Sequence, residues 1–323
     1  MARAESKASV SNRDTARAGL DRGLRLFVAL VKVMAPAYLA VAILKRTVVL
    51  EALCAFVAPA MQFCGLPPET AVPMVVGWFI NLYAAIGAMQ ALSLNASQIT
   101  QLAVVCLIAH NLVVEVAVVA RLKTRWFLIL VFRVLFGLAM GAAMHYLFGF
   151  GGDLSPDAAS ILPPRPGMLE EWGKDAMGLA NTLGKTFAIV VPLMVLMEFL
   201  RNGPWLDRLT NATYRPLRIL GLEKHSVMPL WAGFFLGIAY GAGMILDAAE
   251  NEGFTGRQAF LVSVFLGVCH AIVEDTLLFA AIGANVFWIT VPRIALACIL
   301  TWMSAHLLAR VRPVENGVRI EQA

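Results

Sequence analysis

Long apolar blocks constrain this chain more than any other feature of its sequence. Blocks of about twenty residues with few charges recur along it, which is the length that a helix needs to span a bilayer. Hydrophobic residues make up 59% of the 323 residues and charged residues only 15%, whereas about 45–50% apolar residues is usual for a soluble domain. The pattern predicts an all-α, polytopic membrane protein. It excludes a secreted disulfide scaffold and a nucleic-acid-binding domain.

Eight membrane-spanning helices are expected from length and scarcity of charge. They cover residues 24–44, 70–92, 98–120, 126–149, 176–200, 228–249, 258–282 and 286–309. The polar, basic arm at 1–23 is too long for the basic region of a secretory signal, so we expect it to be retained and cytoplasmic. The Gly- and Pro-rich stretch 151–175 has the composition of a linker, and 312–323 form a C-terminal tail.

The two halves on either side of this linker, 24–150 and 176–311, match each other. At a shift of 156 residues the matches are Pro36 with Pro192, Leu44-Lys45 with Leu200-Arg201, Gly65-Leu66 with Gly221-Leu222, Pro73 with Pro229, and Gly77 with Gly233. At a shift of 160 residues they are Gln98 with Gln258, His110 with His270, Glu115 with Asp275, Phe127 with Phe287, and Arg133 with Arg293. Prolines, glycines and charges match by chance less often than Leu, Val and Ala. A duplicated chain is therefore predicted.

One element in each half leaves two topologies open. The segment 205–220 carries four charged residues, so we interpret it and its counterpart 47–64 as amphipathic helices at the membrane interface. Each repeat then has four transmembrane helices plus one interfacial helix, and the repeats are parallel. Five spans per half would make them inverted and would bring most basic residues to the cytoplasmic side.

Four charged residues within the predicted spans form two equivalent pairs. Glu115 and Arg133 are equally far from residue 124, the turn of a helical hairpin, so they lie at similar depth. Asp275 and Arg293 are placed in the same way about Ala284. An ionisable group inside a span needs a partner, a cavity or a solute pathway. We expect each carboxylate to contact its arginine.

Three further residues are candidates for binding or coupling. His110 and His270 each precede the acidic residue of their half by five positions, about 140° around a helix, so neither shares a face with it. Glu274 follows His270 by four positions on the same helical stripe, and Val114 stands at its counterpart. Glu274 is therefore the strongest functional candidate. The alternative for all these residues is a purely structural role in fixing helix register.

Other chemistry is not expected. The five cysteines form no CxxC and no Cys/His cluster, so we expect no disulfide framework, no metal site and no cofactor. Catalytic motifs are missing and no nucleophile–base set can be assigned, so an enzyme is not expected. The glycines at 233, 237, 241 and 243 allow either close helix packing or a broken helix that lines a site.

These residues resemble the Gate, or nucleoside-recognition, membrane family, which includes spore maturation proteins A and B and two segments of ferrous iron transporter B. The shared pattern is a proline in an apolar helix, an amphipathic helix, Gly-Leu-Pro or similar, then a proline and a glycine. It reads Pro36, Gly65-Leu66-Pro67, Pro73 and Gly77, and again Pro192, Gly221-Leu222, Pro229 and Gly233. The resemblance covers nearly the whole chain outside the tails and the linker. It implies passage of a solute without naming the solute.

The chain departs from the iron transporter at the Gate glycines. That transporter has a cysteine close after the glycine, where this chain has Trp78-Phe79-Ile80 and Phe234-Phe235-Leu236, and this chain has no GTPase domain. Ferrous iron is therefore not the expected cargo. The leading hypothesis is a permease in a bacterial inner membrane for a nucleoside, metal ion or organic anion, with the lipid bilayer and another copy or subunit as partners. The alternative is a membrane scaffold or accessory subunit that transports nothing.

Overall fold

Every regular element in the described part of this computed structural model is helical, which confirms the all-α prediction. The structure describes residues 12–44, 59, 61–122, 124–151, 168–202, 205–238, 241–245 and 255–310. The first half contains α1 (Asn12–Leu44), η1 (Pro68–Thr70), α3 (Ala71–Phe79), α4 (Leu82–Gln90), α5 (Ala96–Ile108), α6 (Leu112–Arg121) and α7 (Trp126–Phe148). The second half contains α8 (Met168–Asn202), α9 (Trp205–Leu217), η3 (Arg218–Leu220), α10 (Lys224–Leu236), α12 (Gly256–Val268), α13 (Ile272–Ala281) and α14 (Val286–Arg310).

Six helical segments among the described residues are long and apolar enough to cross a membrane, three in each half. They are Asn12–Ile43, Ala96–Arg121, Trp126–Phe148, Trp172–Phe199, Gly256–Ala281 and Val286–Leu307. The expectation of eight spans is wrong because two of the expected spans are interrupted. The polytopic class itself stands.

The segment 70–92 folds back on itself, and neither of its helices is long enough to cross a bilayer. Its two helices, α3 and α4, have nine residues each, so each is about 13 Å long against a hydrocarbon core of about 30 Å. Asn81 separates them and caps α4 by accepting a hydrogen bond from the Ala84 N–H. A Cβ atom on Gly77 would lie 3.1 Å from the Cβ of Ala85. These two residues are equally far from Asn81, so α3 and α4 form a hairpin.

The segment 228–249 is also interrupted. Helix α10 ends at Leu236, and Gly237 follows with φ +97°. A Cβ atom on Gly241 would lie 2.8 Å from the Cα of Gly233, across the break. The glycine run therefore serves both expected purposes, a broken helix and a close backbone approach. Tyr240 and Asp247 lie outside the described residues.

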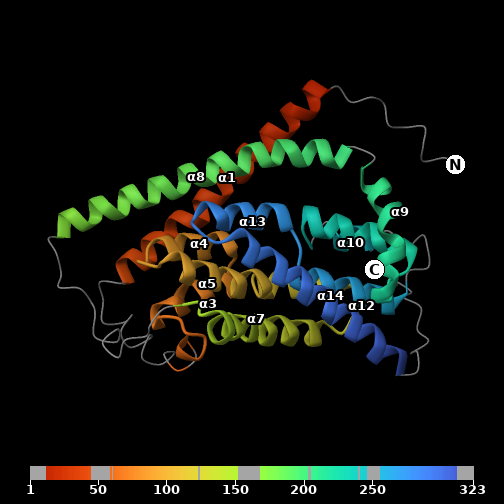
Figure 1. The fold of residues 1–323 in the computed structure, drawn as a ribbon. Helices are drawn as coiled ribbons and strands as arrows, with labels where there is room; N and C mark the ends of the chain where they lie inside the picture. Colours follow the sequence, from red (N-terminus) through yellow and green to blue (C-terminus); the bar gives the residue numbers. More distant parts are fainter. Residues whose placement is uncertain are drawn as a thin grey trace.

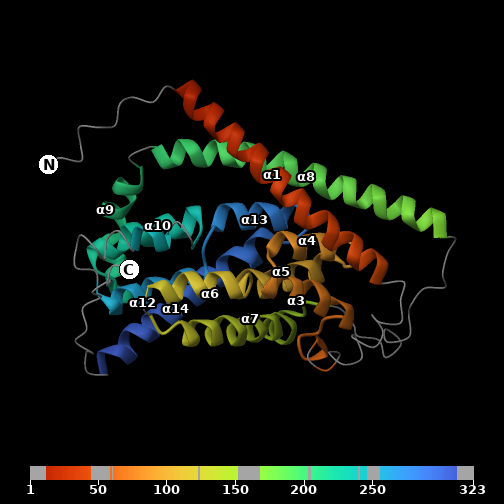
Figure 2. The same ribbon diagram turned by 180° about the vertical axis from the view of Figure 1, so that it is seen from behind.

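The equivalent long helices of the two halves, α1 and α8, pack in opposite directions (Figures 1 and 2). Gly19 near the start of α1 faces Val195 near the end of α8, whereas Tyr38 near the end of α1 faces Gly178 near the start of α8. Arg22 and Glu198 form an ion pair at one end of this contact. The halves thus pack antiparallel and not parallel as expected, which agrees with the three candidate spans that each half has among the described residues.

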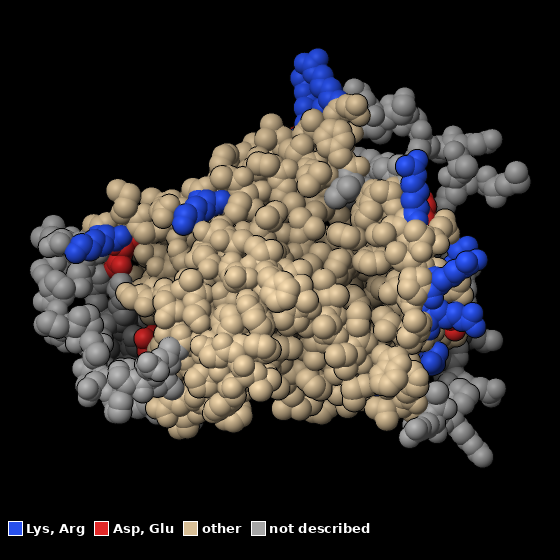
Figure 3. All heavy atoms as spheres, viewed as in Figure 1, with Lys and Arg blue, Asp and Glu red and all other residues tan. Residues whose placement is uncertain are grey.

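The two ends of the molecule differ in charge. The start of α1, the α6–α7 turn, α9 and the end of α14 lie at one end, where most visible basic side chains gather, and the surface between the ends is mainly uncharged (Figure 3). The four charged residues of α9 and η3, Asp207, Arg208, Arg215 and Arg218, are exposed, as an amphipathic interfacial helix requires. The counterpart expected at 47–64 lies outside the described residues except for its last turn.

Two boundaries differ from the sequence expectations. Helix α1 begins at Asn12, so the second part of the expected arm at 1–23 is helical. Helix α8 begins at Met168, inside the expected linker at 151–175. Both helices extend an apolar span by two to three polar turns, where the sequence lacks the apolar residues used to place the ends.

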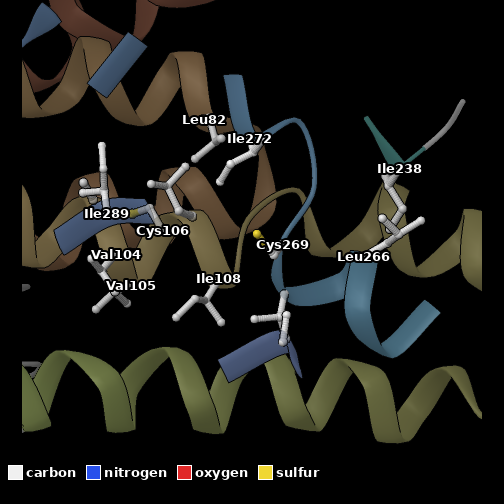
Figure 4. Packing of buried hydrophobic residues seen from close by; sticks show 14 of the residues in the cluster. Leu82, Val104, Val105, Cys106, Ile108, Ile238, Leu266, Cys269, Ile272 and Ile289 are labelled. Atoms are coloured by element: carbon white, nitrogen blue, oxygen red, sulfur yellow. The ribbon is translucent and has the colours of Figure 1, made fainter. Parts of the chain in front are cut away.

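The main hydrophobic core contains residues of both halves (Figure 4). Leu82 of α4 lies close to Ile272 of α13. Val105 of α5 packs on Gly141 of α7, and Ile108 packs on Gly137, where the missing side chains let the two helices approach. The segments 96–121 and 256–281 are 67% and 78% buried in their apolar stretches, against 28–33% for the other four spans. These two segments form the centre of the protein.

Candidate functional site

Both central segments are broken at their histidines. Helix α5 ends at Ile108 and α6 begins at Leu112, while α12 ends at Val268 and α13 begins at Ile272. The segments run in opposite directions, since the Asn285 N–H beyond the end of α13 donates to the Thr100 hydroxyl near the start of α5. They meet at His110 and His270, whose ring centroids are 4.9 Å apart. The two breaks therefore lie side by side within the core.

Each break contains a residue in the left-handed backbone region. Asn111 has φ 47° and Ala271 has φ 46°, and they are the two non-glycine residues with positive φ in the described chain. This conformation is unfavourable for an L-residue, by roughly 1–3 kcal/mol, and such strain clusters at functional sites. The freed backbone groups are used, because the Asn111 N–H donates to the Gly77 carbonyl (2.8 Å) and the Ala271 N–H to the Gly233 carbonyl (3.3 Å). Each break is thus held by the hairpin of its own half.

In the first half, Arg133 closes the open end of α5. Its Nε donates to the Ile108 carbonyl (2.9 Å) and its Nη2 to the His110 carbonyl (2.8 Å). Its Nη1 lies 2.7 Å from Oε2 of Glu115, which is in the first turn of α6. A cation at a helix C-terminus and an anion at an N-terminus both match the helix dipoles. Arg133 and Glu115 together neutralise the two helix ends that the break leaves in the core.

The other oxygen of Glu115 meets both histidines. Oε1 lies 3.1 Å from Nε2 of His110 and 3.4 Å from Nε2 of His270, and the two Nε2 atoms are 3.2 Å apart. All three side chains are at least nine-tenths buried. This is a group of three side chains from the two halves that could hold a metal ion.

The second half repeats the arrangement more loosely. Nη2 of Arg293 lies 3.6 Å from Oδ2 of Asp275 and donates to the His270 carbonyl at 3.3 Å. Nε and Nη1 of Arg293 are buried without a hydrogen-bond partner, whereas Oε2 of Glu115 and Oδ2 of Asp275 each make only an ion pair with their arginine. Aspartate has one methylene fewer than glutamate, so Asp275 does not reach the histidines. Two donor atoms of Arg293 thus remain unused, whereas Nε, Nη1 and Nη2 of Arg133 all have partners.

Glu274 joins the two halves by another route. Its Oε1 accepts a hydrogen bond from the hydroxyl of Tyr83, which lies in the first turn of α4 in the other half. The contact ties α13 to the hairpin tip of the first half. Glu274 is half-buried, beside the buried Asp275.

The sequence predicts both carboxylate–arginine contacts, and the structure confirms them. The sequence prediction is wrong about the histidines, because the angle between His110 and Glu115 was derived for one continuous helix. The break in the helix turns the His110 ring back onto the carboxylate of Glu115. His270 and Glu274 share no helical stripe for the same reason. Sequence reasoning misses Tyr83, whose single hydroxyl in an apolar hairpin gives little signal.

These features define a polytopic, all-helical membrane protein whose two antiparallel halves meet at a pair of broken helices. The chain is 34% identical over 304 residues to a protein named uncharacterized membrane protein YvoD from Bacillus subtilis (strain 168), covering 93% of this chain and 97% of that protein. It belongs to the family of that membrane protein. No family model matches the chain, and no solved structure matches it.

Proposed function

We propose that this protein is a transporter that moves a small polar or ionic solute through a site between its two halves. The observation that supports the proposal best is the pair of broken helices that meet in the core with ionisable side chains at both breaks. Secondary transporters commonly bind their solutes at such discontinuous helices near the middle of the membrane. Broken backbone at that depth is tolerated where it is buried in protein or lines a cavity.

The arrangement of hairpins and halves supports the same function. Antiparallel halves with three spans each have the geometry of inverted repeats, which alternate access by moving one part against the other. The resemblance to the Gate family, through Pro73, Gly77, Pro229 and Gly233, also implies solute passage. Gly77 and Gly233 now have a role in this proposal, because their carbonyls hold the two breaks.

Glu274 is the proposed coupling residue. It has no counterpart in the first half, where Val114 stands, and its partner is the Tyr83 hydroxyl. An arginine fixes the charge of a buried carboxylate permanently, whereas a tyrosine hydroxyl leaves it able to exchange a proton or meet a cation. The Tyr83 contact also lets a change at Glu274 act on the opposite hairpin.

The charge distribution supports one orientation of the protein in the bacterial inner membrane that we propose for it. Positively charged segments near span ends stay on the cytoplasmic side. Basic residues lie at the start of α1 (Arg13, Arg17), at the α6–α7 turn (Arg121, Arg125) and in the first turn of α12 (Arg257). These three parts of the chain lie at one end of the molecule (Figure 2). Both ends of the described chain are thus cytoplasmic in this proposal, and the α7–α8 connection is on the other side.

A scaffold remains the second candidate, and one observation favours it. Arg133 engages two carbonyls and a carboxylate at 2.7–2.9 Å, so the first half is paired as a purely structural junction would be. The second junction, where Nε and Nη1 of Arg293 make no hydrogen bond, favours transport.

Uptake into liposomes tests the proposal. The purified protein is reconstituted and screened with labelled nucleosides, divalent metal ions and organic anions, with and without a proton gradient. We expect saturable uptake of one class that Glu274→Gln strongly reduces or makes independent of pH. Absence of uptake in every class, from protein that is folded and inserted in both orientations, favours the scaffold.

A further inference from the structure

Three hydrogen-bond acceptors converge at the contact between the two halves. Nδ1 of His110 lies 3.0 Å from the Cys106 carbonyl, and Nδ1 of His270 lies 2.6 Å from the Leu266 carbonyl. A carbonyl only accepts, so each Nδ1 carries a proton, and a ring with this one proton presents a bare Nε2 lone pair. Both lone pairs face each other and Oε1 of Glu115. Three buried lone pairs repel one another unless a cation lies among them.

We infer that His110, Glu115 and His270 bind a divalent transition-metal ion that joins the two halves. The three ligand atoms form a triangle with sides of 3.1, 3.2 and 3.4 Å. In tetrahedral coordination with metal–nitrogen bonds of about 2.0–2.1 Å, neighbouring ligand atoms are about 3.3–3.4 Å apart. The triangle therefore has the size of one face of a tetrahedral site.

A proton satisfies this triangle less well than a metal ion. One proton makes one hydrogen bond and leaves the third acceptor facing the other two at 3.1–3.4 Å. A metal ion placed above the triangle meets all three lone pairs at once. The Nδ1 contacts also match a metal site, since metal-binding histidines nearly always donate their other ring N–H to a carbonyl or carboxylate.

Arg133 positions the carboxylate for this site. It holds Oε2 of Glu115 at 2.7 Å and leaves Oε1 as a single ligand atom. Three protein ligands leave the fourth position of a tetrahedral ion open for water or a solute. Two imidazoles with one carboxylate suit Zn²⁺, Co²⁺ or Ni²⁺, whereas Mg²⁺ and Ca²⁺ prefer sites made of oxygen atoms.

Cobalt binding tests the inference without any transport assay. The wild-type protein in detergent, stripped with a chelator, is titrated with Co²⁺, whose tetrahedral complexes absorb visible light far more strongly than the aqueous ion. We expect one tetrahedral Co²⁺ per chain, displaced by Zn²⁺, and two imidazole ligands by X-ray absorption. Absence of a tetrahedral spectrum, or a count of ligands without two imidazoles, overturns the inference.

Variants then locate the ion. Glu115→Gln and His270→Asn each remove a ligand, so the affinity should fall by more than about 100-fold, beyond the range typical of residues that only support a ligand. His306→Asn is the matched control, because exposed His306 contacts the carbonyl four residues earlier in the same way and lies outside the triangle. Loss in His306→Asn alone places the ion elsewhere and overturns the inference. If the ligand variants fail to fold, the wild-type ligand count decides.

The proposed metal site and the proposed transport can be refuted independently of each other. A bound ion with no uptake of any solute keeps the metal site and removes the transporter. Uptake of a solute by protein that shows no tetrahedral Co²⁺ does the reverse.

Discussion

The two junctions at the centre of the molecule share a plan but differ in how completely they are paired. In the first, Arg133 makes three contacts of 2.7–2.9 Å and Glu115 reaches both histidines. In the second, Arg293 makes two contacts of 3.3 and 3.6 Å, and Glu274 turns to Tyr83 of the other half. The Glu115 side chain is one methylene group longer than that of its counterpart Asp275. The first junction therefore has the closer contacts, and the second holds its arginine and aspartate more loosely.

The largest expected effect concerns the antiparallel orientation of the two halves, which brings the two junctions together. In a variant with Thr124→Cys, a membrane-impermeant thiol reagent should label from the cytoplasmic side, and with Gly173→Cys only from the opposite side. Both variants also carry Cys54→Ser and Cys298→Ser, because Cys298 is only half-buried and Cys54 lies outside the described residues, whereas Cys64, Cys106 and Cys269 are buried and should not react. A cysteine fits at Gly173, where a Cβ meets nothing within 4 Å. The reverse pattern, with Thr124→Cys labelled only from the outside and Gly173→Cys labelled from the cytoplasmic side, would restore parallel halves with an even number of spans.

The next effect compares the two arginines directly. Arg133→Met strands Glu115 and two carbonyls in the core, so we expect a loss of about 3–5 kcal/mol in the free energy of unfolding. Arg293→Met should cost clearly less, because its contacts are longer and fewer. Unfolding of the purified variants in mixed detergent measures both.

A double-mutant cycle completes this comparison. Adding Glu115→Gln to Arg133→Met should recover much of the loss, since both charges are then gone. Equal losses for the two arginines, or strictly additive effects of Glu115 and Arg133, would mean that the junctions do not differ as their contacts indicate.

The third effect tests the residue that only the second half has. Glu274→Gln should leave abundance and folding normal but reduce uptake by about 10–100-fold, or remove the pH dependence of uptake. This factor corresponds to the free energy of a hydrogen bond to a charged group. Tyr83→Phe keeps the carboxylate and should have a smaller effect. Failure of Glu274→Gln to accumulate in the membrane would assign Glu274 to the structural contacts.

The smallest effect concerns backbone strain at the breaks. Ala271→Gly should raise stability by about 0.5–1 kcal/mol, because glycine relieves the left-handed strain and loses part of the gain through a more flexible unfolded chain. Asn111→Gly should change little, since asparagine tolerates this conformation. Thermal unfolding of the two variants side by side checks this, and a destabilised Ala271→Gly would argue against strain at that position.

Contacts of the candidate site were predictable from sequence spacing where the helix is continuous and were not predictable where the helix is broken. The spacing of Glu115 and Arg133 about residue 124 gave their contact, because both lie on unbroken stretches next to one turn. The His110 contacts were not predictable, since neither Ala109 nor Asn111 marks a break as proline or glycine would, and Ala271 disfavours the conformation that it adopts. The hairpin at Asn81 was hidden by uniform apolarity, and the wrong span count followed from it. The excess of basic residues that eight spans placed outside was the one sign against that count.

The position of the histidine pair has an electrical consequence. His110 and His270 lie near the middle of the segments 96–121 and 256–281. A cation that reaches them from either face crosses about half of the membrane voltage, worth about 1 kcal/mol per elementary charge at 100 mV. A divalent ion there would gain or lose about twice that, so its occupancy would change by tens of fold when the membrane depolarises.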